Sequence, residues 1–199
     1  MSWEKFWPFS KNDENDDYNV KNDEIFIKGK FTQLRSKKIE DANNDYNWRL
    51  DNELSNLDAT KPINLSYKEF LKYHKEDVKF PNLNSLRMAI DTLHGKHIGN
   101  CMFYDINTRT LQAEFGIMIG NKEYWNNGYG SDAMKNAVGY FFNNKNINHI
   151  YLHTLVDNIR AQKSFQKCGF KKIKNITKEN SEFIYMEIWR KDWEIINIK

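Results

Sequence analysis

Gly128 and Gly130 stand one residue apart in a turn whose backbone could bind an anion. The turn follows an apolar stretch predicted as a strand (residues 117–119) and precedes a predicted helix. At a helix start the first amide N–H groups lack partners and the helix dipole is positive, so a phosphate is favoured there. The alternative is a tight turn that simply needs glycine. The pattern is neither a P-loop, since no Gly-Lys-Ser/Thr follows, nor a dinucleotide fingerprint, since the third glycine is missing.

A second segment, one strand later, joins a polar residue to a short helix. Asn158 follows a predicted buried strand (residues 150–156), and Ala161, Phe165 and Cys168 form an apolar stripe that ends at Gly169. Asn158 is suited to cap the helix, or to donate and accept hydrogen bonds at the strand end. By itself this segment predicts only a capped amphipathic helix.

The histidines and cysteines give weaker signals. His94 and His97 flank a turn and His149 and His153 share one strand face, but no further ligand stands at metal-binding spacing, so we expect no metal site. No Gly-x-Ser-x-Gly elbow is present and neither cysteine has an obvious base, which argues against a covalent acyl-enzyme. We expect the two cysteines to pack as small apolar residues.

The elements that must position these residues follow from hydrophobic periodicity. Helical spacing covers residues 39–50, a segment after Ser66, residues 134–142 and residues 161–168. The predicted strands are residues 25–34, 86–93, 96–106, 111–119, 150–156, 170–176 and 182–189. The second, third and fourth of these form a meander, because turn sequences separate them. The order predicts a mixed α/β (α+β) sheet around one core.

Composition restricts the class of protein. The chain has 199 residues, of which 13 Phe, 10 Tyr and 6 Trp can fill a core, and its net charge is +3. Without a cluster of basic residues, duplex binding is not its main function. No apolar run approaches the roughly 18 residues of a membrane span, and the two cysteines, without a secretory signal, are typical of a reducing compartment. We expect a cytoplasmic protein that binds neither nucleic acid nor membrane.

The ends of the chain differ from its middle. Residues 1–24 combine an aromatic cluster (Trp3, Phe6, Trp7, Phe9) with a polar run that cannot bury apolar surface, and we expect them to form a separate tail. The cluster could fold back on the domain, bind a partner or be ill-ordered. Residues 25–193 form one domain without a linker or repeat, and residues 194–199 form a short C-terminal tail.

Together, the two site-bearing segments resemble the GNAT superfamily of acetyl-CoA-dependent N-acetyltransferases. The family turn Q/R-x-x-G-x-G/A stands here as WNNGYG (residues 125–130), and the family motif N-x-x-A-x-x-x-Y/L-x-K-x-G-F stands as NIRA (158–161) followed by FQKCGF (165–170). The tryptophan that opens the turn, after Tyr124 and the AEFG strand (113–116), most resembles the RimJ/RimL-type branch. The resemblance covers residues 31–189. It implies a GNAT-like sheet of six or seven strands, splayed between strands 4 and 5, with about four helices.

The resemblance also implies how acetyl-CoA, the acyl donor, is bound. The turn would hold its pyrophosphate, the splayed strand would pair with the amides of its pantetheine, and Asn158 would hydrogen-bond the pantetheine arm. The cofactor-binding residues implied are Ile117, Met118, Ile119, Asn126, Asn127, Gly128, Tyr129, Gly130, Ser131, Asn158 and Phe165. Lys163 and Lys167 could approach the phosphates or be merely solvated.

Transfer to an amine needs proton acceptors and help for the leaving thiolate. Glu114 is our candidate base, because family members often place a glutamate in this strand. Many members supply the acid from a tyrosine at the position of Phe165, which cannot donate a proton. Tyr185 on the last strand, Tyr151, a hydrogen bond from Asn158, or water are the alternatives.

The acceptor amine would lie beside the first helices. Trp48, Asp51 and Glu53, together with Asp58, combine acids with an aromatic wall that suits a cationic amine, although they could be ordinary surface charges. We therefore predict an N-acetyltransferase that moves an acetyl group directly, in a ternary complex, to a small-molecule amine or a protein N-terminus, as a monomer or homodimer. A non-catalytic acyl-CoA-binding or sensory domain, favoured by Phe165, and an interaction module that uses the N-terminal cluster are the alternatives.

Overall fold

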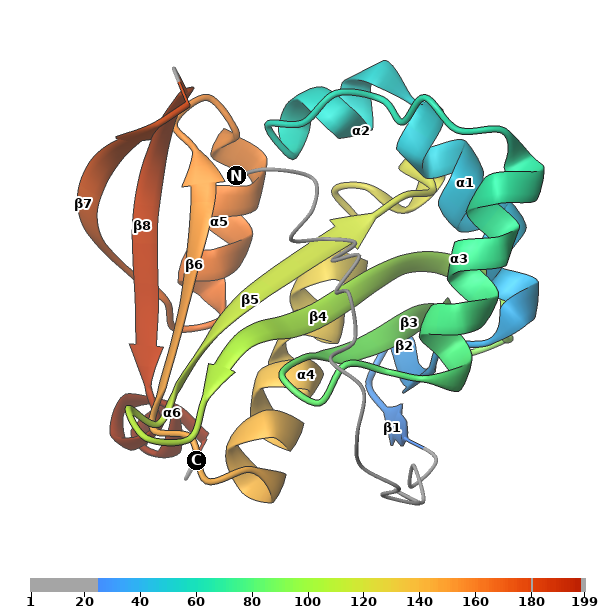
Figure 1. Cartoon of the computed structure of the whole chain (residues 1–199). Helices are drawn as coiled ribbons and strands as arrows, with labels where there is room; N and C mark the ends of the chain where they lie inside the picture. Colours follow the sequence, from blue (N-terminus) through green and yellow to red (C-terminus); the bar gives the residue numbers. More distant parts are fainter. Residues whose placement is uncertain (1–24, 180, 198–199) are drawn as a thin grey trace.

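A computed structural model describes residues 25–179 and 181–197, which form one eight-stranded mixed sheet with helices on both faces (Figure 1). The strand order is β1-β2-β3-β4-β5-β6-β8-β7. The strands are β1 (Phe26–Lys28), β2 (Thr32–Ser36), β3 (Leu86–Thr92), β4 (His97–Asn107), β5 (Gln112–Ile119), β6 (His149–Leu155), β7 (Lys171–Lys178) and β8 (Ser181–Trp189). The helices are α1 (Ala42–Leu50), α2 (Asn52–Leu57), α3 (Tyr67–Lys79), α4 (Tyr129–Asn144), α5 (Ile159–Lys167) and α6 (Arg190–Asn197), with short 3-10 turns η2 (Ile39–Asp41) and η3 (Lys122–Tyr124).

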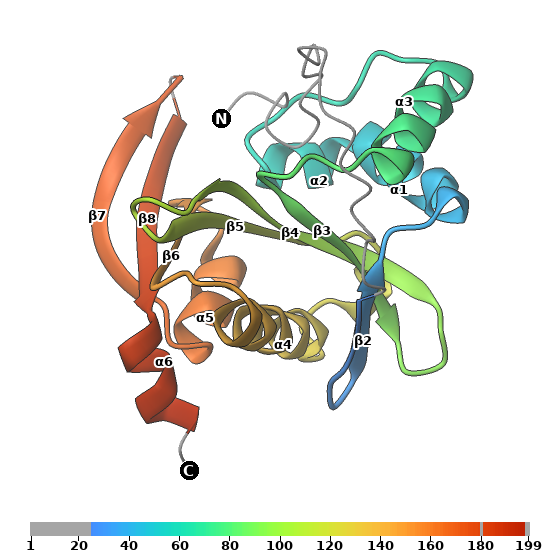
Figure 2. The ribbon, with the colours of Figure 1, turned by 60° about the horizontal axis from the view of Figure 1, so that its bottom comes forward.

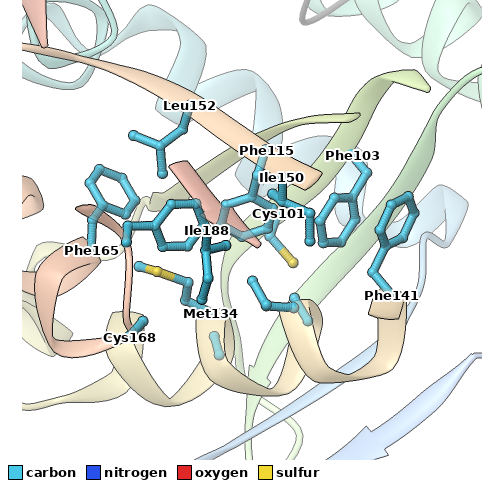
Figure 3. Packing of buried hydrophobic residues seen from close by; sticks show 14 of the residues in the cluster. Cys101, Phe103, Phe115, Met134, Phe141, Ile150, Leu152, Phe165, Cys168 and Ile188 are labelled. Atoms are coloured by element: carbon cyan, nitrogen blue, oxygen red, sulfur yellow. The ribbon is translucent and has the colours of Figure 1, made fainter. Parts of the chain in front are cut away.

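The core lies between the sheet and helices α4 and α5. In Figure 2 these two helices lie on one side of the sheet and α1, α2 and α3 lie on the other. The apolar residues of α4 recur at helical spacing, so they form one buried stripe against the strands. Phe141 of α4 stacks on Phe103 of β4 with ring centroids 3.8 Å apart, at one end of the cluster in Figure 3, while Phe165 of α5 lies at the other end.

The sheet opens between β5 and β6. These parallel strands are paired in the described chain at three positions, from Gln112↔His149 to Glu114↔Tyr151, whereas β4 stays paired with β5 as far as Ile119. The backbone of residues 115–119 is therefore free of strand pairing on the side that faces β6. This is the predicted splay between the fourth and fifth predicted strands, and the prediction is confirmed.

Buried ion pairs fasten the helical layer to strands β2–β4. The guanidinium of Arg35 lies 2.7 Å from a carboxylate oxygen of both Asp41 and Asp91, and Lys37 Nζ lies 2.7 Å from Asp45 Oδ2. Breaking one of these pairs would leave a buried charge uncompensated, which is costly. The network therefore fixes the start of α1 over the sheet.

The mixed α/β fold agrees with the prediction, but some elements differ. The single strand expected over residues 25–34 is the hairpin β1–β2, because the chain turns where Gly29 N–H donates to the carbonyl of Thr32. Helix α2 was not expected, since six residues are too few for a periodic pattern. Helix α6 begins directly after β8 and crosses the boundary expected at residue 193. The predicted tail at residues 1–24 lies outside the described residues.

None of the helices described is long and apolar enough to span a membrane.

Candidate active site

A groove of about 450 Å³ begins where β5 and β6 separate. Its walls are the free end of β5, the turn before α4 and one side of α5, and residues of α2 contribute to its lining; Figure 1 shows the gap between β5 and β6 opening toward α2 and α5. Nine of the predicted cofactor residues line it: Ile117, Met118, Ile119, Asn126, Gly128, Gly130, Ser131, Asn158 and Phe165. Two do not, because the Asn127 side chain donates to the carbonyl of Glu123 and the Tyr129 ring packs against Tyr124.

The turn before α4 presents free backbone amides to this groove. Gly128 is the N-cap of α4 with φ +85°, and Asn126 also has a positive φ of 62°. The first N–H of α4 that donates to a carbonyl four residues earlier is that of Asp132, which lies 2.9 Å from the carbonyl oxygen of Gly128. The N–H groups of residues 129–131 therefore have no partner within the helix. A glycine N-cap has no side chain to satisfy them. They form a positive end suited to a phosphate.

Gly130 has room for a side chain in the protein itself. An added Cβ would have one heavy atom within 4 Å among the described residues, Ile119 Cγ1 at an ordinary 3.5 Å, and it would point across the groove. Packing therefore does not require glycine here, and the family turn accepts alanine at this position. A larger side chain would stand where a ligand must approach the backbone.

Basic side chains of α5 line the opposite wall. Arg160, Lys163 and Lys167 all line the groove, and the guanidinium carbon of Arg160 lies 3.5 Å from the ring centroid of Trp125. The Trp125 indole in turn donates to the carbonyl of Ile119 at 2.6 Å. This stack holds a cation beside the end of β5, where it can face phosphate groups.

Two predicted residues, Asn158 and Phe165, line both the groove and a smaller space beside it. Asn158 caps α5, its Oδ1 accepting from Ala161 N at 3.1 Å, which leaves its NH₂ group to donate. Phe165 is buried and lines both the groove and a smaller cavity of about 70 Å³ between β5 and β6. We call this smaller space the junction cavity. A thiolate there would meet an amide donor and an apolar ring.

Glu114 is buried and is separated from the junction cavity by its partners. Its Oε1 lies 2.6 Å from His153 Nδ1, and it also accepts the hydroxyl hydrogen of Tyr104. Lys178 Nζ lies 3.2 Å from His153 Nε2; since an ammonium can only donate, Nε2 accepts and Nδ1–H donates to Glu114. Tyr104 and His153 line the junction cavity and Glu114 does not. Any proton that reaches Glu114 from the cavity must pass through one of them.

Tyr185 lies one strand away from this cavity. On β8 it faces His153, with ring centroids 5.4 Å apart, and it stacks on Tyr151 at 5.6 Å. Burial, together with the neighbouring Glu187, raises the pKa of Tyr185 to about 12. Neither tyrosine lines the groove or the junction cavity. Tyr185 is therefore badly placed to protonate a leaving thiolate.

The third space, which we call the acceptor cavity, lies between the sheet and helices α1 and α3. It measures about 90 Å³, and its lining combines apolar side chains, among them Phe70, Met88 and Met102, with polar and charged ones. Its other lining residues include Asp58 at the end of α2, and Gly116 and Met118 of β5. The cavity thus reaches the same stretch of β5 as the groove.

The predicted acceptor residues Trp48, Asp51 and Glu53 do not line any of these three cavities. A Cβ on Gly120 would come within 2.1 Å of the Trp48 ring, so this ring packs directly on the end of β5. Asp51 caps α2 and lies 2.8 Å from Lys122 Nζ, which Glu53 also contacts at 2.7 Å. These residues join α1 and α2 to the loop after β5. Asp58, noted with them in the sequence, does line the cavities.

Residues 32–171 match the family model described as the acetyltransferase (GNAT) domain. The chain belongs to the GNAT family. It is 31% identical over 84 residues to spermidine N(1)-acetyltransferase of Vibrio cholerae; the match covers 42% of this chain and 48% of that protein, so it spans about half the length of that curated relative.

Solved GNAT structures have the same fold. Spermidine N-acetyltransferase from Vibrio cholerae in complex with CoA and spermine aligns with a TM-score of 0.72 at 21% identity, over 81% of this chain and 97% of that one. A GNAT-family acetyltransferase from Bacillus anthracis aligns with a TM-score of 0.69 at 16% identity, over 84% and 99%. These findings confirm the predicted superfamily and its fold. The RimJ/RimL-type branch stays a prediction.

Sequence reasoning missed Tyr104 and Arg160 as site residues of this GNAT domain. Tyr104 is the Cα partner of Glu114 across β4 and β5, so aligning the two predicted strands would have found it. Arg160 lies inside the quoted NIRA motif, but its stack on Trp125 joins segments 35 residues apart and has no local signal.

Metal ligation has no support in the part of the chain that the structure describes. No group of three or more His, Cys, Asp or Glu side chains there is arranged to hold an ion. Two of the predicted strand histidines pair with carboxylates instead, His149 with Glu187 at 3.0 Å and His153 with Glu114.

Proposed function

We propose that this protein transfers an acetyl group from acetyl-CoA to a primary amine, directly in a ternary complex. The observation that carries the proposal is the unpaired edge of β5, which leads along the groove to the free amides of residues 129–131. An extended arm with amide groups can pair with a free strand edge, and a pyrophosphate suits a helix start. The pantetheine and pyrophosphate of CoA have this order.

The donor would be held along the groove by contacts of two kinds. Backbone groups of Ile117 and Ile119, together with the free NH₂ of Asn158, face the space where the pantetheine would lie. Arg160 and the lysines of α5 supply charge beside the phosphates. The CoA in the solved spermidine acetyltransferase complex supports this choice of donor.

Two protons leave the nitrogen when an ammonium becomes an amide, one before attack and one after. Glu114 is proposed as acceptor for the second, acting through Tyr104 or His153 because these partners separate it from the junction cavity. This keeps the predicted base but makes its action indirect. The NH₂ of Asn158 would stabilise the leaving thiolate, a role for which Tyr185 is poorly placed.

A small-molecule amine is the favoured acceptor. The curated relative is named for spermidine, itself an aliphatic amine, and its similarity supports an acceptor of this kind. A protein N-terminus, the acceptor of a RimJ/RimL-type enzyme, is the second candidate, and cytoplasmic location remains part of the proposal. An acyl-CoA-binding domain without activity is the alternative that Phe165 favours, because an apolar ring stands where many family members have a tyrosine.

Release of free thiol from acetyl-CoA tests the proposal. The purified protein is given acetyl-CoA with single amines: n-butylamine, spermidine and a peptide with a free N-terminus. Amine-dependent release confirmed by the mass of the acetylated product supports transfer. Binding of CoA without release for any amine would leave the acyl-CoA-binding alternative standing.

A further inference from the structure

Asp58 lies where the three spaces of the site meet. Among the described residues, it alone lines the CoA groove, the acceptor cavity and the junction cavity. Met118 lines the first two of these spaces and Gly116 the last two. A thioester carried along β5 and an amine in the acceptor cavity would therefore meet beside the Asp58 carboxylate.

The surroundings of Asp58 leave part of its carboxylate available. It follows α2 directly, and its Oδ2 lies 3.3 Å from Nη1 of Arg49, a long contact made by one oxygen. The structure records no hydrogen bond to Oδ1 from the described residues. Burial raises the pKa of Asp58 to about 7, against the attraction of the Arg49 guanidinium. A carboxylate with this pKa can take up and release a proton near neutral pH.

The rest of the acceptor cavity suits a short aliphatic chain. Its volume is about 90 Å³. The apolar part of its lining is Phe70, Val78, Met88, Cys101, Met102 and Met118. The polar lining residues other than Asp58 and Arg49 already make contacts: Lys37 and Asn100 with Asp45 at 2.7 Å, Arg87 with Asp77, and His74 with the carbonyl of Lys38. A polar group beside the amine would lose its hydration there and would have to compete with these contacts.

We propose that Asp58 binds the ammonium group of the acceptor and removes its proton, while the acceptor cavity holds the aliphatic segment next to that nitrogen. This inference rests on the proposed acetyl transfer and specifies its substrate class: primary amines on a short, unbranched aliphatic segment.

The proposed step moves two protons from the nitrogen and one onto the sulfur. The ammonium gives one proton to Asp58, and the freed nitrogen lone pair forms a bond to the acetyl carbon. The carbon–sulfur bond breaks and the thiolate leaves, taking a proton from solvent. The second proton of the nitrogen passes through Tyr104 to Glu114, and both carboxyl groups later release their protons to water. The net products are the amide, CoA thiol and one proton.

Other charged or titratable groups face Asp58 from each neighbouring element. They are Arg49 from α1, His74 from α3, Tyr104 from β4, His153 from β6 and Arg160 from α5, and the ion pairs of Asp45 and Asp77 line the acceptor cavity behind it. Of these groups, Arg49 makes the direct contact and is always protonated. A titration near pH 7 in the acceptor kinetics is therefore assigned to Asp58, and its loss in a variant tests that assignment.

The experiment compares Asp58→Asn with a matched control. Asp192 of α6 is also paired with a cation, Lys171 at 2.9 Å, and its side chain is 23% exposed against 25% for Asp58, but it lines none of the three cavities. With n-butylamine, we expect Asp58→Asn to lower kcat/KM by about 100-fold or more and to leave CoA affinity unchanged. Asp192→Asn should match the wild type. In the wild type, kcat/KM should rise with pH and level off above about 7, and Asp58→Asn should lack this rise.

The acceptor class is tested with 2-methoxyethylamine, which replaces one methylene of n-butylamine by oxygen. We expect its kcat/KM, compared per ammonium at a pH where both amines are protonated, to be roughly tenfold lower, because the ether oxygen would lose its hydration and would have to compete with the ion pairs of the cavity for a donor. Equal values would overturn the aliphatic cavity. Asp58→Asn activity within threefold of wild type, or an unchanged pH profile, would overturn the role of Asp58.

Two measurements separate this inference from the proposed function and from misfolding. If the wild type acetylates no amine, the proposed function fails, but the role of Asp58 can still be tested by the binding of n-butylammonium to the CoA-bound protein. The inference requires that the wild type binds n-butylammonium and that Asp58→Asn does not. Equal binding by both proteins, or no binding by the wild type, overturns it. If Asp58→Asn does not fold, the pH profile of the wild type and Asp58→Glu decide. A retained carboxylate should keep measurable turnover, and complete loss in a folded Asp58→Glu together with no wild-type titration near pH 7 would contradict the inference.

Discussion

Replacing Gly130 by valine should weaken CoA binding while the free protein stays about as stable as the wild type. The family turn accepts glycine or alanine at this position, so the substitution that tests it must be larger than alanine. The added Cβ would lie 3.5 Å from Ile119 Cγ1, which is ordinary van der Waals contact, so the protein can accept it. Valine in a helix is no less favourable than glycine. The free protein should therefore unfold within roughly 2–4 °C of the wild type.

The valine side chain would stand between the groove and the free amides of α4. It would hold a phosphate away from the N–H groups of residues 130 and 131, and a hydrogen bond to a charged group contributes about 1.5–3 kcal/mol. Losing about 3 kcal/mol weakens CoA binding roughly 100-fold, since 1.4 kcal/mol corresponds to a factor of ten. Titration calorimetry with CoA measures this directly, and thermal unfolding without ligand measures the first effect.

Gly95→Val is the control for a glycine outside the groove. Gly95 has a positive φ of +82°, no described atom lies within 4 Å of an added Cβ, and it lies in the β3–β4 turn, outside the groove lining. This variant should lose about 1–2 kcal/mol of stability from backbone strain and bind CoA normally. CoA affinity of Gly130→Val within twofold of wild type would refute the assignment of this turn to the pyrophosphate.

Three further substitutions follow from the same geometry. Arg160→Ala removes the cation stacked on Trp125 and should weaken CoA binding about tenfold by calorimetry, with little change in melting temperature. Glu114→Gln should lower kcat about 100-fold while CoA affinity stays the same; equal turnover would dismiss Glu114 as a proton acceptor. Asp132→Asn should cost roughly 2 kcal/mol of unfolding free energy at pH 7, because this carboxylate accepts hydrogen bonds from the hairpin residues 30–32. Burial raises the pKa of Asp132, but these hydrogen bonds outweigh it and lower the pKa below its ordinary value. The stabilisation is therefore present above the ordinary aspartate pKa near 4 and is lost as the pH falls below it. Urea unfolding of both proteins at pH 7 and pH 3 should show a smaller difference in unfolding free energy at pH 3, and a constant difference would contradict this.

Periodicity predicted most of the fold because its core elements are regular. Helix α4 carries its apolar residues at helical spacing, and strands β3 to β5 alternate between clear turn sequences, so both were recognisable without a structure. Helix α2 has only six residues, defined by the Asp51 cap rather than by a pattern. Helix α6 follows β8 with no glycine or proline between them, so no local signal marks its start.

The donor side of the site was more predictable than the acceptor side for a physical reason. The turn at residues 125–130 and the start of α5 each act through their own backbone, so a short motif contains the chemistry. The acceptor side is assembled from α1, α3, the end of α2 and three strands, and its members are far apart in sequence. Asp58 was noticed as an acid near the first helices, but only tertiary packing sets it apart from Asp51 and Glu53 by placing it where three cavities meet.

A crystal structure of the protein with CoA and n-butylamine would show directly whether donor and acceptor meet where β5 and β6 separate. We expect the pyrophosphate on the amides of residues 129–131, the pantetheine alongside residues 117–119, and the amine nitrogen within hydrogen-bonding distance of Asp58 beside the CoA sulfur. CoA bound elsewhere, or a pantetheine arm that does not enter the gap between β5 and β6, would contradict it.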